Sequence, residues 1–152
     1  MHYAHRGDVL RFAGEPDVVL RALYPTEEGI SKDGPIVLKI EYSGVGILLA
    51  QNLEKADETR LVGLEEGGEL ASDVLLVPRH ATEDALSAEL LEAVQPKVAI
   101  ISVGADNRAG DPSPDVLRRL LSAGARVYRT DVDGTVGMII DQGQLWMVSE
   151  KK

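Results

Sequence analysis

Histidine and carboxylate side chains are the residues of this chain that could bind a metal ion and activate water. The 152 residues include three histidines and no cysteine, so thiolate metal sites and disulfides are excluded. His2 and His5 stand close to the start of the sequence, where we do not expect metal ligands. His80 stands alone after a run of β-branched residues, and a lone histidine is more often structural than a ligand.

Four arginines, Arg118, Arg119, Arg126 and Arg129, could follow a phosphate backbone. The formal net charge of −9 works against unassisted binding of nucleic acid, because lysine and arginine supply most of the non-specific affinity. We therefore interpret the four arginines as a solvated helix face and a strand end. DNA remains a weak alternative partner.

The pattern of apolar residues predicts the strands and helices that position these side chains. Strand-like runs occupy 9–12, 18–23, 36–42 and 45–49, and Ser43-Gly44 predicts a tight turn between the last two. After Asn52, the spacing of Leu53, Ala56, Thr59-Arg60 and Leu64 predicts a helix. Strands then alternate with helices, and the expected strands are 74–77, 98–103, 127–129, 136–140 and 145–148.

Two serines mark the helices of this second part. Ser87 is expected to cap a helix over 87–94, and Ser113-Pro114 to open one that ends at Gly124. The order of elements predicts one α+β domain over 1–152, with enough apolar residues, 44%, for a core. No run of about eighteen apolar residues is present, so we expect a soluble domain without direct membrane insertion.

Several short motifs occur in a fixed order along the chain. They are Val74–Pro78 followed by Arg79-His80-Ala81-Thr82, then Pro96-Lys97, Ala99–Gly104, the loop 106–114 (Asp-Asn-Arg-Ala-Gly-Asp-Pro-Ser-Pro), and 127–135. This order resembles the metallo-β-lactamase-fold domain of ComEC-type DNA-uptake (competence) proteins, over about residues 7–148. The resemblance implies half of, or a degenerate form of, an αββα sandwich.

The resemblance also implies where metal ligands would stand. The metal-bridging aspartate of the family falls at Asn52, its paired histidines at Arg79 and His80, and its loop histidine at Asp111. Its upstream His-x-His-x-Asp-His motif is absent from the sequence. Only His80 keeps the family residue type, and the permanent charge of Arg79 opposes a neighbouring Zn²⁺ or Mn²⁺. We expect no intact catalytic set and no cofactor, with His80 and Asp111 as weak metal candidates.

Arg79 and Asp111 would converge on the metal position if the fold of the family is kept. We predict that they form an ion pair there, the guanidinium replacing the cation. The alternative is that both side chains lie free in solvent.

Two hypotheses of function follow from the resemblance. The first is a non-catalytic module with a structural or binding role in competence, and the second is a metal-dependent phosphodiesterase or nuclease completed by a missing segment or partner chain. Zn²⁺ or Mn²⁺ would be the cofactor in the second case. A lone half of the sandwich would expose an apolar sheet face, so we expect a homodimer or a complementing chain. In the family that the chain resembles, this domain lies on the extracytoplasmic side of a bacterial membrane channel protein.

Overall fold

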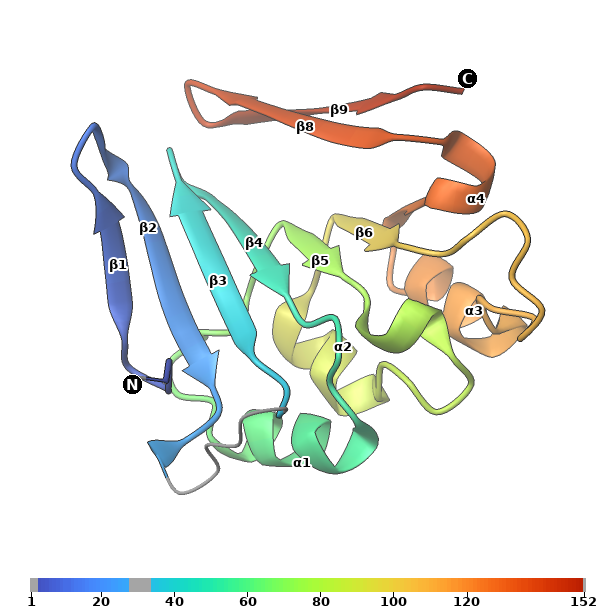
Figure 1. Ribbon diagram of the computed structural model, residues 1–152, viewed down its shortest axis with the longest axis horizontal. Helices are drawn as coiled ribbons and strands as arrows, with labels where there is room; N and C mark the ends of the chain where they lie inside the picture. The colour runs from blue at the N-terminus through green and yellow to red at the C-terminus, as the bar shows by residue number, and fades with distance from the viewer. Residues whose placement is uncertain (1–2, 28–33, 152) are drawn as a thin grey trace.

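A mixed sheet of seven strands, arranged in sequence order, forms the centre of the molecule in this computed structural model (Figure 1). The structure describes residues 3–27 and 34–151. The first four strands form an antiparallel meander, with β1 at the sheet edge. They are β1 (Val9–Phe12), β2 (Glu15–Tyr24), β3 (Val37–Tyr42) and β4 (Val45–Leu49).

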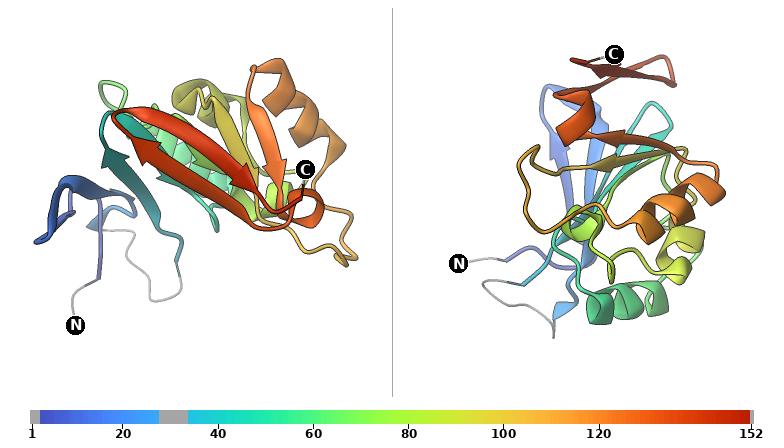
Figure 2. Two further views of the ribbon diagram at one scale, coloured as in Figure 1. Left: turned by 90° about the horizontal axis from the view of Figure 1, so that it is seen from above. Right: turned by 90° about the vertical axis from the view of Figure 1, so that its right-hand side faces the viewer.

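The second part of the sheet is parallel. Strands β5 (Val74–Leu76), β6 (Val98–Ile101) and β7 (Arg126–Arg129) continue from β4, each in the same direction. The crossovers carry α1 (Lys55–Gly63), α2 (Ala88–Val94) and α3 (Pro114–Ser122). Because parallel crossovers share one hand, strands added in one direction place all three helices on one face of the sheet. Figure 2 shows these helices together on one side.

The main core lies between the helices and the sheet. Its fully buried side chains alternate along the strands with residues of the other face, as strand geometry requires. The helix-side members include Leu48, Leu75 and Ala99 from strands and Leu61, Leu90 and Leu120 from helices.

A hairpin of β8 (Val136–Asp141) and β9 (Gln144–Ser149) covers part of the opposite face (Figures 1 and 2). It follows the short helix α4 (Thr130–Asp133). Its inner residues pack over the sheet residues Ile47, Val74, Val98, Ile100 and Tyr128; they are Val136, Ile140, Leu145 and Met147. The result is three layers: helices, mixed sheet and hairpin.

The α+β class predicted from the sequence is confirmed, as are the main elements. Ser43 and Gly44 both have positive φ, +50° and +80°, as a tight hairpin turn requires. The hydroxyl oxygen of Ser87 accepts a hydrogen bond from the amide of Leu90, and that of Ser113 from the amide of Asp115. Both helix starts were therefore placed correctly.

Three local features differ from the prediction. Of the positions whose spacing predicted α1, Leu53 is buried and Leu64 packs against the core, whereas Ala56, Thr59 and Arg60 are exposed. The fully buried side chains within the helix are Glu58 and Leu61, so the spacing identified the helix but only part of its buried face. A 3₁₀ helix, η2 (Pro78–Ala81), follows β5, and α4 follows β7. Neither short helix carries enough residues for a periodic signal.

Candidate functional site

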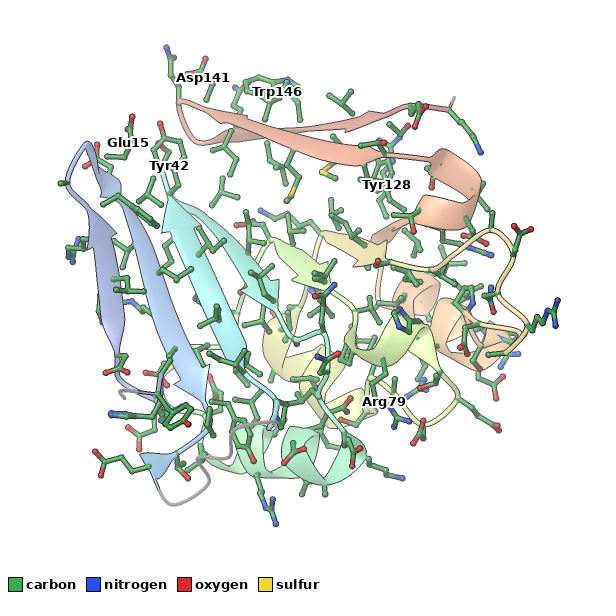
Figure 3. All side chains as sticks on the ribbon, in the orientation of Figure 1. Glu15, Tyr42, Arg79, Tyr128, Asp141 and Trp146 are labelled. Atoms are coloured by element: carbon green, nitrogen blue, oxygen red, sulfur yellow. The ribbon has the colours of Figure 1, made fainter. Side chains whose placement is uncertain are left out.

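The four positions singled out from the sequence lie in loops that follow neighbouring parallel strands. Asn52 comes after β4, Arg79 and His80 after β5, and Asp111 in the loop between β6 and α3. The carboxyl ends of parallel strands meet at one edge of a sheet, and ligands commonly bind at such edges. The structure thus brings these loops to one edge, where Figure 3 labels Arg79.

Hydrogen bonds of the main chain hold these loops together. The amide of Arg79 donates to the carbonyl of Gln51 at 2.6 Å, which joins the loops after β5 and β4. The amide of Ser113 donates to the carbonyl of Ala81 at 2.8 Å, which joins the loop after β6 to η2.

Thr130 joins the ends of β6 and β7. Its hydroxyl donates to the carbonyl of Val103 at 2.7 Å and accepts from the amide of the same residue at 2.8 Å. A single side chain therefore satisfies both polar groups of one main-chain residue at this edge.

The turn after β5 has an unusual backbone. Arg79, His80 and Ala81 have φ values of +45°, +55° and +60°, all in the left-handed region. Each such residue costs about 1 to 2 kcal/mol for an L-amino acid with a side chain. The surrounding contacts must offset this cost, and the turn aims the side chains of Arg79 and His80.

The predicted ion pair between Arg79 and Asp111 was wrong. Within the described residues, the guanidinium of Arg79 forms its ion pair with Asp84, at 2.7 Å, and none with Asp111. Asp84 lies five residues further along the same loop and also accepts a hydrogen bond from Thr82 Oγ1 at 3.0 Å. The hydrogen bond from Arg79 lowers the pKa of Asp84. A partner in the same loop needs no long-range ordering, which favours it over Asp111.

Asp111 belongs to a loop that is folded around Asn107. The Asn107 side-chain oxygen accepts from the amides of Gly110 and Asp111, and its nitrogen donates to the carbonyls of Gly104 and Asp111. The side chain of Asn107 therefore shapes this loop. In the part of the chain that the structure describes, the carboxylate of Asp111 itself has no hydrogen bond or ion pair.

His80 is fixed through one ring nitrogen. Its Nδ1 lies within hydrogen-bonding distance of the carbonyl oxygen of Ser102, the residue after β6. A carbonyl only accepts, so Nδ1 carries the proton and the lone pair of the neutral ring lies on Nε2. His80 is exposed, so Nε2 is the group that can accept a proton or bind a cation.

The described residues at this edge supply few metal ligands. In the residues described, no group of three or more histidine, aspartate or glutamate side chains could hold a metal ion. Asn52 is exposed and offers a neutral amide oxygen, and the guanidinium of Arg79 lies beside His80 in the chain.

Other candidate residues lie outside this arrangement. His5 contacts Asp8 and Glu27, at 3.8 and 3.7 Å, near the start of β1. His2 lies outside the described residues. His5 thus offers no ligand at this edge.

The four arginines each have a partner within the molecule. Arg118 pairs with Asp115 at 2.8 Å, Arg129 with Asp131 at 2.6 Å, and Arg126 lies 5.0 Å from the Tyr128 ring centre; Arg119 donates to main-chain carbonyls of the loop before α2. These contacts favour the structural interpretation over a phosphate-binding track.

Glu58 is a positioning residue that the sequence did not reveal. It is fully buried in α1, and its two carboxylate oxygens accept from the amides of Leu86 at 2.7 Å and Ser87 at 2.6 Å. On the other side of the same loop, Arg119 donates to the carbonyls of Leu86 and Ala85. The segment between η2 and α2 is therefore held from two helices.

Comparison with known proteins relates the chain to competence proteins. It is 33% identical over 133 residues to ComE operon protein 3 of Bacillus subtilis (strain 168), which covers 86% of this chain and 16% of that protein. It is 32% identical over 107 residues to Competence protein ComA of Neisseria gonorrhoeae, which covers 70% of this chain and 15% of that protein. No model of a protein family matches the chain.

The chain spans about a sixth of the length of these two relatives. Within the described residues, no helix is long and apolar enough to cross a membrane.

Proposed function

We propose that the chain is a non-catalytic module, related to the metallo-β-lactamase-like domain of ComEC-type proteins, with a structural or binding role in competence and DNA uptake. The similarity over 86% of the chain to a protein named for competence carries this proposal. The loops at the carboxyl edge support its non-catalytic part. Main-chain hydrogen bonds join these loops, while the side chains at the positions that correspond to the family's ligands are an amide, a guanidinium, one imidazole and one carboxylate.

Charge at the edge also supports a site without a metal. Arg79 carries a permanent positive charge and is neutralised by Asp84 rather than by Asp111. Asn52 supplies no negative charge and Asp111 a single one, so these positions would compensate a bound divalent cation only in part.

One observation favours the second candidate function, a metal-dependent phosphodiesterase or nuclease completed by a missing segment or partner chain. His80 presents Nε2 to solvent with its Nδ1 proton fixed on a carbonyl, which is the arrangement that metal-binding histidines use. The unengaged carboxylate of Asp111 could join it.

Elemental analysis separates the two candidates. The protein is purified without chelators or a metal-affinity tag, incubated with Zn²⁺ and Mn²⁺, desalted and analysed beside His80→Ala. We expect no stoichiometric metal, an unchanged melting temperature, and no Mn²⁺-dependent cleavage of single-stranded DNA. Near-stoichiometric metal together with cleavage, both lost in His80→Ala, would replace our proposal by the enzyme.

The competence role needs its own test. Deletion of the gene in its native host, followed by measurement of DNA uptake, is expected to lower uptake, and complementation with the His80→Ala variant is expected to restore it. Unchanged uptake after deletion would contradict the proposed role.

A further inference from the structure

The first strand leaves one edge of the seven-stranded sheet open. Strand β1 pairs with β2 on one side and, within the described residues, has no strand on its other side (Figure 1). The pairing begins before β1, since the amide of Gly7 donates to the carbonyl of Ala22 at 3.0 Å and the amide of Ala22 to the carbonyl of Asp8 at 2.9 Å. The edge therefore runs over residues 7–12, a length that suits one further strand.

The main chain of this edge can bind an extended backbone. In an antiparallel pair, alternate residues direct their N–H and C=O groups towards the neighbouring strand, and the residues between them direct theirs outwards. The outward groups of β1 therefore have no strand partner within the described residues. Edge strands that avoid pairing usually carry charged side chains. Here a single arginine stands among three exposed apolar side chains, Val9 at 43%, Leu10 at 61% and Phe12 at 51%.

One face of the edge offers an apolar cavity. Leu10 stands opposite Leu20 in the register, and the row continues through Ile40 to Ile47 on the face that carries the hairpin. The hairpin packs over residues of β3 to β7. A cavity of about 400 Å³ remains over β1 to β3, and its apolar lining includes Val9, Leu10, Leu20, Ala22 and Leu38. A side chain opposite Leu10 on an added strand would lie beside this cavity.

The other face of the edge carries a cation. Arg11 is exposed and, in the part of the chain that the structure describes, has no hydrogen bond or ion pair of its side chain. Its diagonal neighbour on the same face of β2, Arg21, is already paired with Glu41 at 2.8 Å. Residues directly opposite each other on paired strands lie about 5 Å apart, and opposite charges there attract. A carboxylate opposite Arg11 on an added strand would therefore supply a partner.

Charge selects among the possible occupants of the edge. Nucleic acid is not favoured, because only one of the two arginines lacks a carboxylate partner and several basic groups are needed to follow a phosphate backbone. A second copy is not favoured either. Its β1 contains no carboxylate to face Arg11, and two chains with a net charge of −9 repel each other. A segment of a different protein can supply the carboxylate.

We propose that the β1 edge binds an extended segment of another protein, in which apolar residues alternate with acidic ones. The segment adds a strand to the sheet, with its apolar side chains towards the cavity beside Leu10 and a carboxylate opposite Arg11. Main-chain hydrogen bonds then supply affinity, and the two faces of the edge select the alternate side chains. The proposal does not depend on the role in competence.

Synthetic peptides test the proposal by calorimetric titration. The probe is a capped peptide with the core Val-Glu-Val-Glu-Val and one lysine at each end, so that its net charge is zero. A charge-inverted peptide exchanges every glutamate and lysine and keeps zero net charge. We expect the wild-type chain to bind the probe about fivefold or more tightly than the inverted peptide. A probe with proline at the central valine is expected to bind about tenfold or more weakly, because proline donates no main-chain hydrogen bond.

Variants of the chain assign the binding to this edge. Arg11→Glu is expected to reverse the order of the two charged peptides. Arg118→Glu is the matched control, because it makes the same change of charge at an exposed side chain of α3 and should leave the order as in wild type. Leu10→Gln replaces a side chain that is already exposed, so it should fold, and it is expected to weaken binding of the probe several-fold.

Hydrogen exchange locates the bound strand. The amides of residues 9–12 are expected to exchange more slowly in the presence of the probe, and at the rate of the free chain in the presence of the proline peptide. The proposal would be overturned by absence of binding, by equal binding of the proline peptide, by protection elsewhere than at β1, or by a peptide order that Arg11→Glu leaves unchanged. Protection of β1 that rises with the concentration of the protein alone would identify a second copy as the occupant, and would overturn it too.

Discussion

Replacing Glu58 with glutamine tests whether one buried carboxylate fixes the segment between η2 and α2. The carboxylate accepts from two main-chain amides, Leu86 at 2.7 Å and Ser87 at 2.6 Å, inside a fully buried environment. Glutamine keeps one acceptor oxygen but turns an NH₂ group towards the other amide. One buried donor then has no acceptor.

The expected loss of stability can be worked from these contacts. A hydrogen bond to a charged group contributes about 1.5 to 3 kcal/mol, and a buried donor without a partner costs about 1 to 3 kcal/mol. A neutral amide is cheaper to bury than a carboxylate, which offsets part of the sum. We expect Glu58→Gln to lower the free energy of unfolding by about 2 to 3 kcal/mol, against a typical total of about 5 to 15 kcal/mol.

Urea unfolding followed by circular dichroism measures this change. Glu92→Gln is the matched control, because Glu92 is an exposed residue of α2 and its replacement should change stability by less than about 0.5 kcal/mol. Hydrogen exchange of the Leu86 and Ser87 amides should accelerate in Glu58→Gln. If Glu58→Gln unfolds at the same urea concentration as the control, the clamp assigned to this carboxylate does not exist.

Three further results are expected. The hydrogen bond from Arg129 lowers the pKa of Asp131 below 3.8, so the pair stabilises the fold above that pH and the contribution disappears as the pH falls through the lowered pKa. Asp131→Asn should be less stable than wild type at neutral pH, with a gap that closes in acid unfolding curves. Arg79→Gly should be more stable than Arg79→Ala by about 1 kcal/mol in urea, because both lose the exposed ion pair but only glycine relieves the positive φ. The triple variant Asn52→Asp, Arg79→His, Asp111→His should fold and compete with a chromogenic chelator for Zn²⁺ better than wild type; equal competition would show that these positions do not converge.

The strands, the tight turn and the helix starts could be predicted because each is determined by residues close together in the sequence. Alternating β-branched residues gave the strands, and Ser43-Gly44 gave a turn whose two residues both have positive φ. Ser87 and Ser113 gave the helix starts because a cap acts on an amide within the next turn.

The errors concern a backbone conformation that the sequence does not signal, a contact between distant segments, and a pair of residues only five apart in the chain. Of Arg79, His80 and Ala81, only the histidine belongs to a type that is enriched in the left-handed region, and no sequence pattern signals three such residues in a row, so this turn was not predicted. No role was predicted for Glu58, because its partners Leu86 and Ser87 lie 28 and 29 residues further on in the chain. The pairing of Arg79 with Asp84 was missed because Asp111 was expected to fill the metal position.

At the carboxyl edge of the sheet, the groups that hold the loops together are largely distinct from the side chains that could perform chemistry. The loops are joined by the amide of Arg79 on Gln51, the amide of Ser113 on Ala81, and the hydroxyl of Thr130 on Val103. The first two bonds use only main-chain groups, so a change of side chain at residue 79 leaves its bond in place. Donor residues at this edge can therefore change while the loops stay where they are. The loop arrangement is accordingly weak support for catalysis, and the side chains at the edge must decide the function.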